Sequence, residues 1–273
     1  METQTQRQTV LFIGAGRMAE AIFAGLLRRE DARIGEIIVS NRSDRERLAA
    51  LQARYGVTVT QDWREQIGRS TVVVLAMPPG DHKAVLAELA SQIGGQFVVT
   101  VAAGVGTQLL EASLPAGTPV AWVMPNTAAM IGESISLYTY GQAVHEEHRE
   151  ILSLLLAGIG ESAECTEQQI HELTAVTGSA PAFLYRFVEA LEASAVSYGL
   201  SADTANKLVA QMVYGSAKML KQGTPPAELR DGVTTPGGAT AAGLRVLDER
   251  GYAEALQDAV VATNARAREM AEK

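Results

Sequence analysis

The chain has 273 residues, of which 47% are hydrophobic, enough for one large or two ordinary domains with a sizeable core. Acidic residues outnumber basic ones by 31 to 23, and the net charge of −8 disfavours nucleic acid and anionic membrane surfaces as partners. A single cysteine, Cys165, excludes an internal disulfide, and four histidines leave little material for a zinc site. We therefore expect a cytoplasmic globular protein without a metal or a membrane-spanning segment.

The first part of the chain alternates short β-rich runs with helical patterns. Several of the runs are apolar throughout, as is typical of parallel strands that are covered on both faces. Strands are predicted at 10–13, 36–40, 57–59, 71–76, 97–101, 120–123 and 135–138. Helices are predicted at 43–55, with Ser43 as the cap, and at 81–92. This alternation predicts an α/β fold with an open, doubly wound sheet.

The second part of the chain contains no predicted strand. Long helices with apolar residues at helical spacing are predicted at 181–198, 201–221, 236–249 and 252–272, separated by Gly and Pro. We therefore predict two domains, a doubly wound α/β domain over 1–165 and an all-α domain over 166–273. The many small apolar residues of the helical half indicate that it serves as a subunit interface.

A glycine turn follows the first predicted strand and opens a helix, with the sequence Gly14-Ala15-Gly16-Arg17-Met18-Ala19. Gly14 permits the tight turn, Gly16 lets a pyrophosphate approach the backbone, and the helix start offers free amides to its charge. The pattern predicts a Rossmann-like dinucleotide site, with a purely structural turn as the alternative. The predicted cofactor contacts in this turn are Gly14, Gly16, Arg17 and Met18.

The end of the second predicted strand indicates which dinucleotide binds. An NAD site usually carries Asp or Glu there, to accept hydrogen bonds from the ribose hydroxyls, but this chain reads Ser40-Asn41-Arg42-Ser43. The guanidinium of Arg42 can pair with a 2′-phosphate, and Asn41 and Ser43 can add donors. We therefore predict NADPH as the cofactor, with NADH possible. The alternative is that Arg42 only caps a surface loop.

An unusual helix start lies in the helical half, at Thr234-Thr235-Pro236-Gly237-Gly238-Ala239-Thr240. Thr235 is a suitable N-cap and Pro236 a suitable first helical residue, yet two glycines follow where helix propensity disfavours them. Without side chains, the amides of Gly237, Gly238 and Ala239 are open to a carboxylate. We predict a site for a small carboxylate substrate here, with a flexible loop as the alternative.

Together these segments resemble the Δ1-pyrroline-5-carboxylate reductase family over nearly the whole chain. The matching motifs are Phe12 to Ile22, Ser40 to Ser43, Met124-Pro125-Asn126-Thr127, Gly178 to Phe183, and the most specific one, Glu228 to Thr240 with Gly243 to Leu247. The resemblance implies NAD(P)H-dependent reduction of a cyclic imino acid to L-proline, the last step of proline synthesis. It also implies a Rossmann domain and an interlocking helical dimerisation domain, in homodimers that can assemble further into rings.

The resemblance also assigns roles to residues. The segment from Pro236 to Thr240 would bind the pyrroline carboxylate, and Thr240, beside the imine nitrogen, would act in catalysis as hydrogen-bond donor or proton relay. The implied substrate contacts are Met124, Thr235, Gly237, Gly238, Ala239 and Thr240. Further implied cofactor contacts are Ala76, Met77, Pro78 and Asn126. The four histidines lie in polar helical patterns and receive no catalytic role.

The chain departs from the family pattern after the fourth predicted strand. The family typically has Ala-x-Lys-Pro there, whereas this chain has Pro78 in place of the lysine, which removes a cation and a backbone donor beside the cofactor path. Lys83 lies one helical turn later and offers possible compensation. Smaller departures are Ala128, where the family commonly has Pro, and Ala180, where it has Gly.

These departures leave three alternatives open. One is a reductase of another cyclic imino acid, and another is a nucleotide-binding regulator without activity. The third is a β-hydroxyacid dehydrogenase, which would need a catalytic lysine in a helix after the Rossmann domain. Lys207 and Lys218 are the nearest candidates, without the glycine-rich context of such a site.

Overall fold

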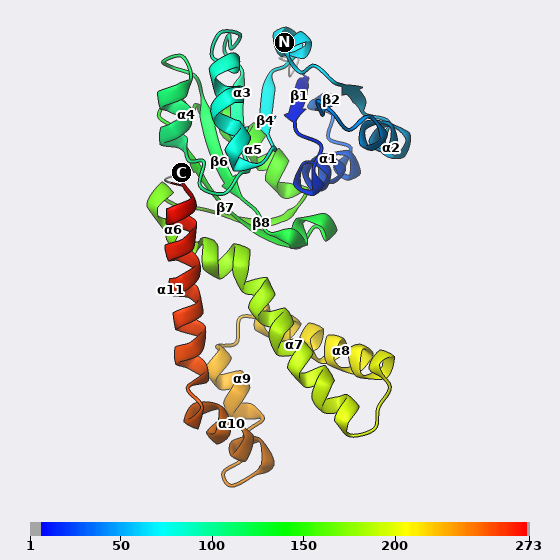
Figure 1. The fold of residues 1–273 in the computed structure, drawn as a ribbon, viewed down its shortest axis with the longest axis vertical. Coiled ribbons are helices and arrows are strands. Elements are labelled where there is room, and N and C mark those ends of the chain that lie inside the picture. The colour runs from blue at the N-terminus through cyan, green and yellow to red at the C-terminus, as the bar shows by residue number, and fades with distance from the viewer. Residues whose placement is uncertain (1–6, 272–273) are drawn as a thin grey trace, which may run out of the picture. The chain divides into compact units, whose positions relative to one another are not determined.

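A computed structural model of the chain describes residues 7–271 (Figure 1). Its strands are β1 (Gln8–Ile13), β2 (Ile34–Ser40), β3 (Thr58–Thr60), β4 (Val72–Leu75), β5 (Phe97–Thr100), β6 (Val120–Met124), β7 (Ser134–Tyr140) and β8 (Gly160–Glu164). They form one sheet in the order β3-β2-β1-β4-β5-β6-β7-β8. The first six strands pair in parallel, and β7 pairs antiparallel to β6. The chain order reverses between β1 and β4, so the predicted doubly wound, Rossmann-like sheet is confirmed.

Helices cover both faces of this sheet. They are α1 (Arg17–Arg29), α2 (Arg45–Tyr55), α3 (His82–Leu89), α4 (Thr107–Ser113), α5 (Glu146–Ala157) and α6 (Glu167–Thr174). Short 3₁₀ segments lie at Arg64–Arg69, Pro79–Asp81 and Thr127–Ile131, and a π-helical turn lies at Ala175–Ser179.

The alternation of side chains along β1 builds two separate cores. Val10 and Phe12 pack with residues of α1, α2 and α5 on one face, whereas Leu11 and Ile13 pack with residues of α3 and α4 on the other. Because successive side chains of a strand point to opposite faces, an unbroken apolar strand requires cover on both sides. The central strands are therefore rigidly buried, and their carboxyl ends lie at one common edge.

Strand β8 was not predicted from the sequence. Its residues read Gly-Glu-Ser-Ala-Glu and are mostly exposed, because β8 lies at the edge of the sheet and pairs only with β7. A polar edge strand has neither an apolar run nor a clean alternation, so its pairing is decided by its neighbour.

The cap predicted for α2 is also wrong. Asp44 rather than Ser43 is the N-cap, and its carboxylate accepts a hydrogen bond from the amide of Arg47 at 2.8 Å. The amide of Ser43 instead donates to the side-chain oxygen of Asn41 at 3.0 Å. Both residue types are good caps, so the sequence left the first residue of the helix undecided.

The second part of the described chain consists of helices. These are α7 (Ala180–Ser197), α8 (Ala202–Leu220), α9 (Pro226–Gly232), α10 (Ala239–Glu249) and α11 (Tyr252–Ala271). The predicted end of the last helix at residue 272 lies outside the described residues. Between residues 7 and 271, no helix is long and apolar enough to cross a membrane.

The chain divides into two compact units. Ser179–Thr263 form one unit, and the described residues before Ser179 form the other together with the end of α11 from Asn264. The side-chain amide of Asn264 donates to the carbonyl of Glu172 at 2.7 Å, which ties this end to α6. The boundary at 165/166 follows the end of β8 and stays a prediction, while the compact units change further along the chain.

Few side chains of the helical unit are buried within it. On α8 only Ala205 and Val209 are buried, and α7 and α10 bury no residue. Large apolar side chains on its helices are exposed instead, and they include Leu184, Tyr185, Leu208, Met212, Met219, Val246 and Val261. This unit therefore lacks the closed core that a free-standing domain of its size would have.

One close contact controls how α1 packs on the first unit. A Cβ placed at Gly25 would lie 2.3 Å from the carbonyl oxygen of Gly158, at the end of α5. Such a distance is far inside van der Waals contact, so position 25 of α1 can lie against Gly158 only if it carries no side chain.

We expect Gly25→Ala to destabilise the protein by about 2 kcal/mol or more, because the added methyl group must push α1 away from α5. The check is the free energy of unfolding from urea titration. Gly68→Ala is the matched control, since a Cβ at Gly68 meets nothing within 4 Å. Equal stability of the two variants would contradict the packing argument.

Candidate functional site: the carboxyl edge of the sheet and the start of α10

The turn between β1 and α1 lies against the end of β4. Gly14 has a φ of +114°, which favours glycine, and its amide donates to the carbonyl of Ser40 at 3.0 Å. A Cβ at Gly14 would lie 2.6 Å from the carbonyl oxygen of Ala76. Glycine is therefore required at position 14 by the packing of the protein itself.

Gly16 differs from Gly14 in what surrounds it. It is the N-cap of α1, with a φ of −71° that any residue can adopt, and a Cβ there would meet nothing within 4 Å. No side chain caps the first amides of α1. The protein leaves open space and unpaired donors at this helix start, where a pyrophosphate is expected to approach.

Side chains of α2 bind the glycine turn and the first turn of α1 through hydrogen bonds and an ion pair. The Nε of Arg47, on α2, donates to the carbonyl of Ala15 at 3.0 Å, and the same guanidinium forms an ion pair with Glu20 of α1. The hydroxyl of Tyr55 also donates to Glu20, at 2.7 Å. Burial raises the pKa of Glu20, but the hydrogen bonds from Tyr55 and Arg47 outweigh it, so the pKa is lowered and the carboxylate stays ionised.

The loop after β2 is shaped by Asn41. Its side-chain oxygen accepts hydrogen bonds from the amides of Ser43 at 3.0 Å and Asp44 at 2.9 Å, so it is used within the loop. The side chain of Arg42 is 84% exposed, and one of its terminal nitrogens lies 3.9 Å from the carboxylate of Asp81. The guanidinium of Arg42 is thus exposed to solvent, at the carboxyl edge of the sheet.

The loop after β4 brings Ala76, Met77 and Pro78 to the same edge. The amide of Ala76 donates to the carbonyl of Ile13 at 2.9 Å, and Met77 packs against the core beneath the loop. The carbonyl of Pro78 accepts the amide of Asp81 at 3.0 Å, which starts the 3₁₀ turn before α3.

His82 lies in a buried position, which corrects the polar surroundings expected from the sequence. It is 1% exposed, and its Nδ1 lies 3.2 Å from the carbonyl of Pro78. Because a carbonyl only accepts, Nδ1 carries the proton, and Nε2 accepts from the hydroxyl of Thr100 at 3.2 Å. Burial lowers the pKa of His82, so the ring is neutral and supports the loop after β4.

Asn126 links the end of β6 to the π-helical turn. Its side-chain nitrogen donates to the carbonyl of Thr177 at 3.1 Å, and its side-chain oxygen accepts the amide of Ala128 at 3.0 Å. Met124, the last residue of β6, is nearly buried. The structure therefore collects the predicted cofactor residues of this unit at the carboxyl ends of β1, β2, β4 and β6.

The start of α10 differs from the prediction. Gly238 is the N-cap and Ala239 the first helical residue, so the assignments of Thr235 as cap and Pro236 as first residue are wrong. Thr235 to Gly238 form a tight turn, in which Gly237 has a φ of +73° and the amide of Gly238 donates to the carbonyl of Thr235 at 2.9 Å. Pro followed by a glycine with positive φ is typical of a type II turn.

This turn changes which donors the helix start can offer. The amide of Gly238 is used within the turn, while no side chain caps α10. A Cβ at Gly238 would lie 2.4 Å from the hydroxyl oxygen of Thr235, so the bare glycine lets this hydroxyl lie beside the helix start. Thr240, in the first turn of α10, lies in the same short segment.

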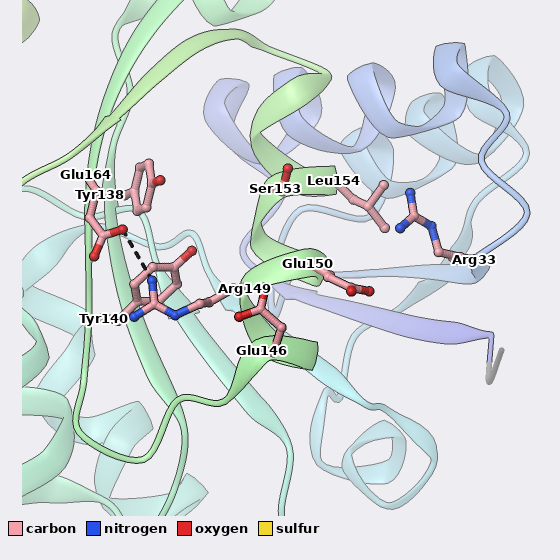
Figure 2. Close-up of a pocket in the computed structure, with 9 residues that line it drawn as sticks. All are labelled: Arg33, Tyr138, Tyr140, Glu146, Arg149, Glu150, Ser153, Leu154 and Glu164. Atoms are coloured by element: carbon pink, nitrogen blue, oxygen red, sulfur yellow. Dashed lines mark hydrogen bonds and ion pairs between the residues drawn. The ribbon is translucent and has the colours of Figure 1, made fainter.

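A hollow elsewhere on the sheet does not match the predicted site. It measures about 370 Å³ and is bordered by β7, β8 and α5 (Figure 2). Arg149 is one of its lining residues. Its guanidinium carbon lies 4.2 Å from the centre of the Tyr140 ring, and its Nη1 lies 3.3 Å from the carboxylate of Glu164. Tyr140 pairs with Ala121 near the start of β6, which places this end of the hollow away from the carboxyl edge. Burial raises the pKa of Tyr140 to about 12, so its phenol stays protonated.

A parallel sheet with a switch point, an open glycine turn at a helix start and an exposed arginine after β2 define a dinucleotide-binding protein of the Rossmann type. Among residues 7–271, no group of His, Cys, Asp and Glu could hold a metal ion.

Comparisons with known proteins refine this class. The family model for pyrroline-5-carboxylate reductase dimerisation matches residues 167–270, and that for NADP oxidoreductase coenzyme F420-dependent matches residues 9–104. Pyrroline-5-carboxylate reductase 1 of Bacillus spizizenii is 37% identical over 268 residues, covering 97% of this chain and 90% of the relative.

Solved structures of reductases with this name have the same fold as this chain. A pyrroline-5-carboxylate reductase of Coxiella burnetii aligns with a TM-score of 0.87 and 31% identity, covering 97% of this chain and 98% of the other. The fold also matches the Plasmodium falciparum pyrroline carboxylate reductase with NADP bound, at a TM-score of 0.86 and 24% identity over 97% of this chain and 99% of that one. The chain belongs to the pyrroline-5-carboxylate reductase family.

The two glycines of the turn are expected to respond differently to the same substitution. Gly16→Ala should leave the melting temperature nearly unchanged and weaken NADPH binding at least tenfold, because its methyl group enters only the space left for the pyrophosphate. Gly14→Ala should instead lower the melting temperature, because its methyl group meets Ala76. Thermal unfolding and fluorescence titration with NADPH check both; unchanged NADPH affinity in Gly16→Ala would support the purely structural turn.

Proposed function

We propose that this chain reduces Δ1-pyrroline-5-carboxylate to L-proline, the last step of proline biosynthesis, with NADPH as the hydride donor. The observation that carries the proposal is the relationship to reductases of this name over 97% of the chain, at 37% identity. The family assignment disfavours the β-hydroxyacid dehydrogenase alternative, whose candidate lysines, Lys207 and Lys218, both lie on α8.

The residues at the carboxyl edge fit NADPH. The open start of α1, with Gly14, Gly16, Arg17 and Met18, suits the pyrophosphate, since its amides are uncapped and a Cβ at Gly16 would fill empty space. The exposed guanidinium of Arg42 suits the 2′-phosphate. The last residues of β2 and the loop after it include no carboxylate before Asp44, whose side chain caps α2.

The substrate carboxylate is assigned to the start of α10. Its uncapped first amides and the positive end of the helix dipole favour an anion there. Thr235 and Thr240 add hydroxyl groups to the same segment. Because the amide of Gly238 is used in the turn, the first amides of α10 itself, at Ala239 and Thr240, become the stronger candidates.

The mechanism depends mainly on orientation. When bound, NADPH supplies a hydride to the C=N carbon of the substrate. Thr240 would donate a hydrogen bond to the ring nitrogen of the substrate or relay a proton to it, and the start of α10 would hold the substrate carboxylate. Met124 and Asn126 shape the nicotinamide side, where Asn126 holds the π-helical turn in place through Thr177.

The helical unit is assigned to homodimerisation. Its helices α7 and α10 bury no residue in one chain and expose large apolar side chains, which a second copy can cover. The match to a reductase dimerisation family over residues 167–270 supports this role. Assembly of dimers into rings and a cytoplasmic location stay predictions.

The activity is tested by following NADPH oxidation in the presence of pyrroline-5-carboxylate. We expect turnover by the wild-type protein and at least a tenfold loss of kcat/KM in Thr240→Ala, with NADPH binding intact, because only the contact to the imine is removed. Thr240→Ser keeps the hydroxyl and is the matched control. NADPH binding without turnover in the wild-type protein would favour the inactive regulator, and unchanged kinetics of Thr240→Ala would remove Thr240 from the site.

The cofactor assignment makes a separate prediction. Arg42→Ala should weaken NADPH binding at least tenfold and NADH binding less than twofold, because NADH lacks the 2′-phosphate. Fluorescence titration with both nucleotides gives the two dissociation constants. Arg29→Ala, which removes an exposed cation at the far end of α1, is the control. Equal weakening of NADPH and NADH would contradict the role of Arg42.

A further inference from the structure

The loops on either side of the glycine turn are joined by a charge contact. Strands β2 and β4 both pair with β1, so the loops that follow them flank the turn at the carboxyl edge. Across this edge, a terminal nitrogen of Arg42 lies 3.9 Å from the carboxylate of Asp81. The residue assigned to the 2′-phosphate therefore lies beside an acidic side chain of the neighbouring loop.

Hydrogen bonds hold the backbone of both loops that carry this pair. The amide of Asp81 donates to the carbonyl of Pro78, which the buried ring of His82 also holds. On the other side, Asn41 accepts two amides of its own loop. The side chain of Asp81 is 42% exposed, so the contact with Arg42 is open to solvent.

The charge of the β4 loop makes this contact important. From Ala76 to Asp81 the segment reads Ala-Met-Pro-Pro-Gly-Asp, so Asp81 is its only charged residue, and the nearest cation in sequence is Lys83 in the first turn of α3. A 2′-phosphate that reaches Arg42 brings further negative charge close to this carboxylate. NADH, with a neutral hydroxyl at that place, meets no such repulsion.

We propose that Asp81 is a specificity-determining residue that limits the preference for NADPH over NADH, by competing for Arg42 and by repelling the 2′-phosphate. This inference rests on the proposed role of Arg42. Both effects act in the same direction, and an exposed pair of this kind is weak enough for a phosphate dianion to displace it. Binding of NADPH then exchanges one ion pair of Arg42 for another.

The test is the ratio of the dissociation constants for NADH and NADPH, measured by fluorescence titration at low ionic strength. We expect Asp81→Asn to tighten NADPH by about 3- to 10-fold and to leave NADH within about twofold, so that the ratio rises. Asp81→Glu keeps the charge and should leave the ratio close to that of the wild type. A ratio that is unchanged or lower in Asp81→Asn would overturn the proposal.

Glu88→Gln is the matched control for net charge. Glu88 is also a half-exposed carboxylate, but it lies at the other end of α3 and pairs with Arg64. We expect no change of the ratio in this variant, because its charge is distant from Arg42. An equal rise in Glu88→Gln and Asp81→Asn would mean a general charge effect and would overturn the specific role of Asp81.

Variants of Arg42 distinguish failure of the role of Asp81 from failure of the proposed role of Arg42 in binding the 2′-phosphate. If Arg42→Ala lowers the ratio while Asp81→Asn leaves it unchanged, the role of Arg42 stands and that of Asp81 is overturned. If Arg42→Ala weakens both nucleotides equally, the role of Arg42 fails and the inference fails with it. In the double variant, most of the gain from Asp81→Asn should be lost; a full gain without Arg42 would overturn competition for Arg42.

Discussion

The close main-chain approach of Gly14 to Ala76 fixes how the turn after β1 lies against the end of β4, and the proposed cofactor site depends on this approach. Only a glycine can bring the turn after β1 so close to the end of β4, since a Cβ at position 14 would lie 2.6 Å from the carbonyl oxygen of Ala76. This approach sets the first turn of α1 above the sheet edge, with its amides uncapped. The same contact places the β4 loop next to the turn, and the proposed path of the nucleotide follows that junction.

A second set of contacts, made by Arg47 of α2, connects the loop that carries Arg42 to the same turn. Helix α2 begins directly after that loop, and its residue Arg47 contacts both the carbonyl of Ala15 and the carboxylate of Glu20. Because Glu20 is ionised and also accepts the hydroxyl of Tyr55, the network resists separation of α1 from α2. The proposed contacts to the pyrophosphate and to the 2′-phosphate are thus kept in one fixed relation by residues that touch neither group.

Local patterns predicted much of the fold, because the buried strands are apolar and the glycine turn has a short signature. They failed where two rules applied to the same residues. Thr235 and Pro236 satisfy the rules for a helix start, yet the same Pro-Gly pair also suits a tight turn, and the turn forms. Strand β8 was missed because its residues are polar and form a strand by pairing with β7, so they show no strand pattern of their own. The strand ends and the glycine turn that meet at the carboxyl edge were predicted, and their role in binding the cofactor stays a prediction. The contacts of Glu20, His82 and Asp81 join distant elements and leave no local signal.

The helical unit leaves most of its apolar side chains uncovered, and only Ala205 and Val209 of α8 are buried in the single chain. If a second copy covers them, the unit gains its stability from a bimolecular step, and the fraction of folded protein depends on its concentration. In a newly made chain the nucleotide-binding unit would then be folded before the helical unit is stabilised by a second copy. The amount of protein in the cell would consequently control how much of it is active, independently of any ligand.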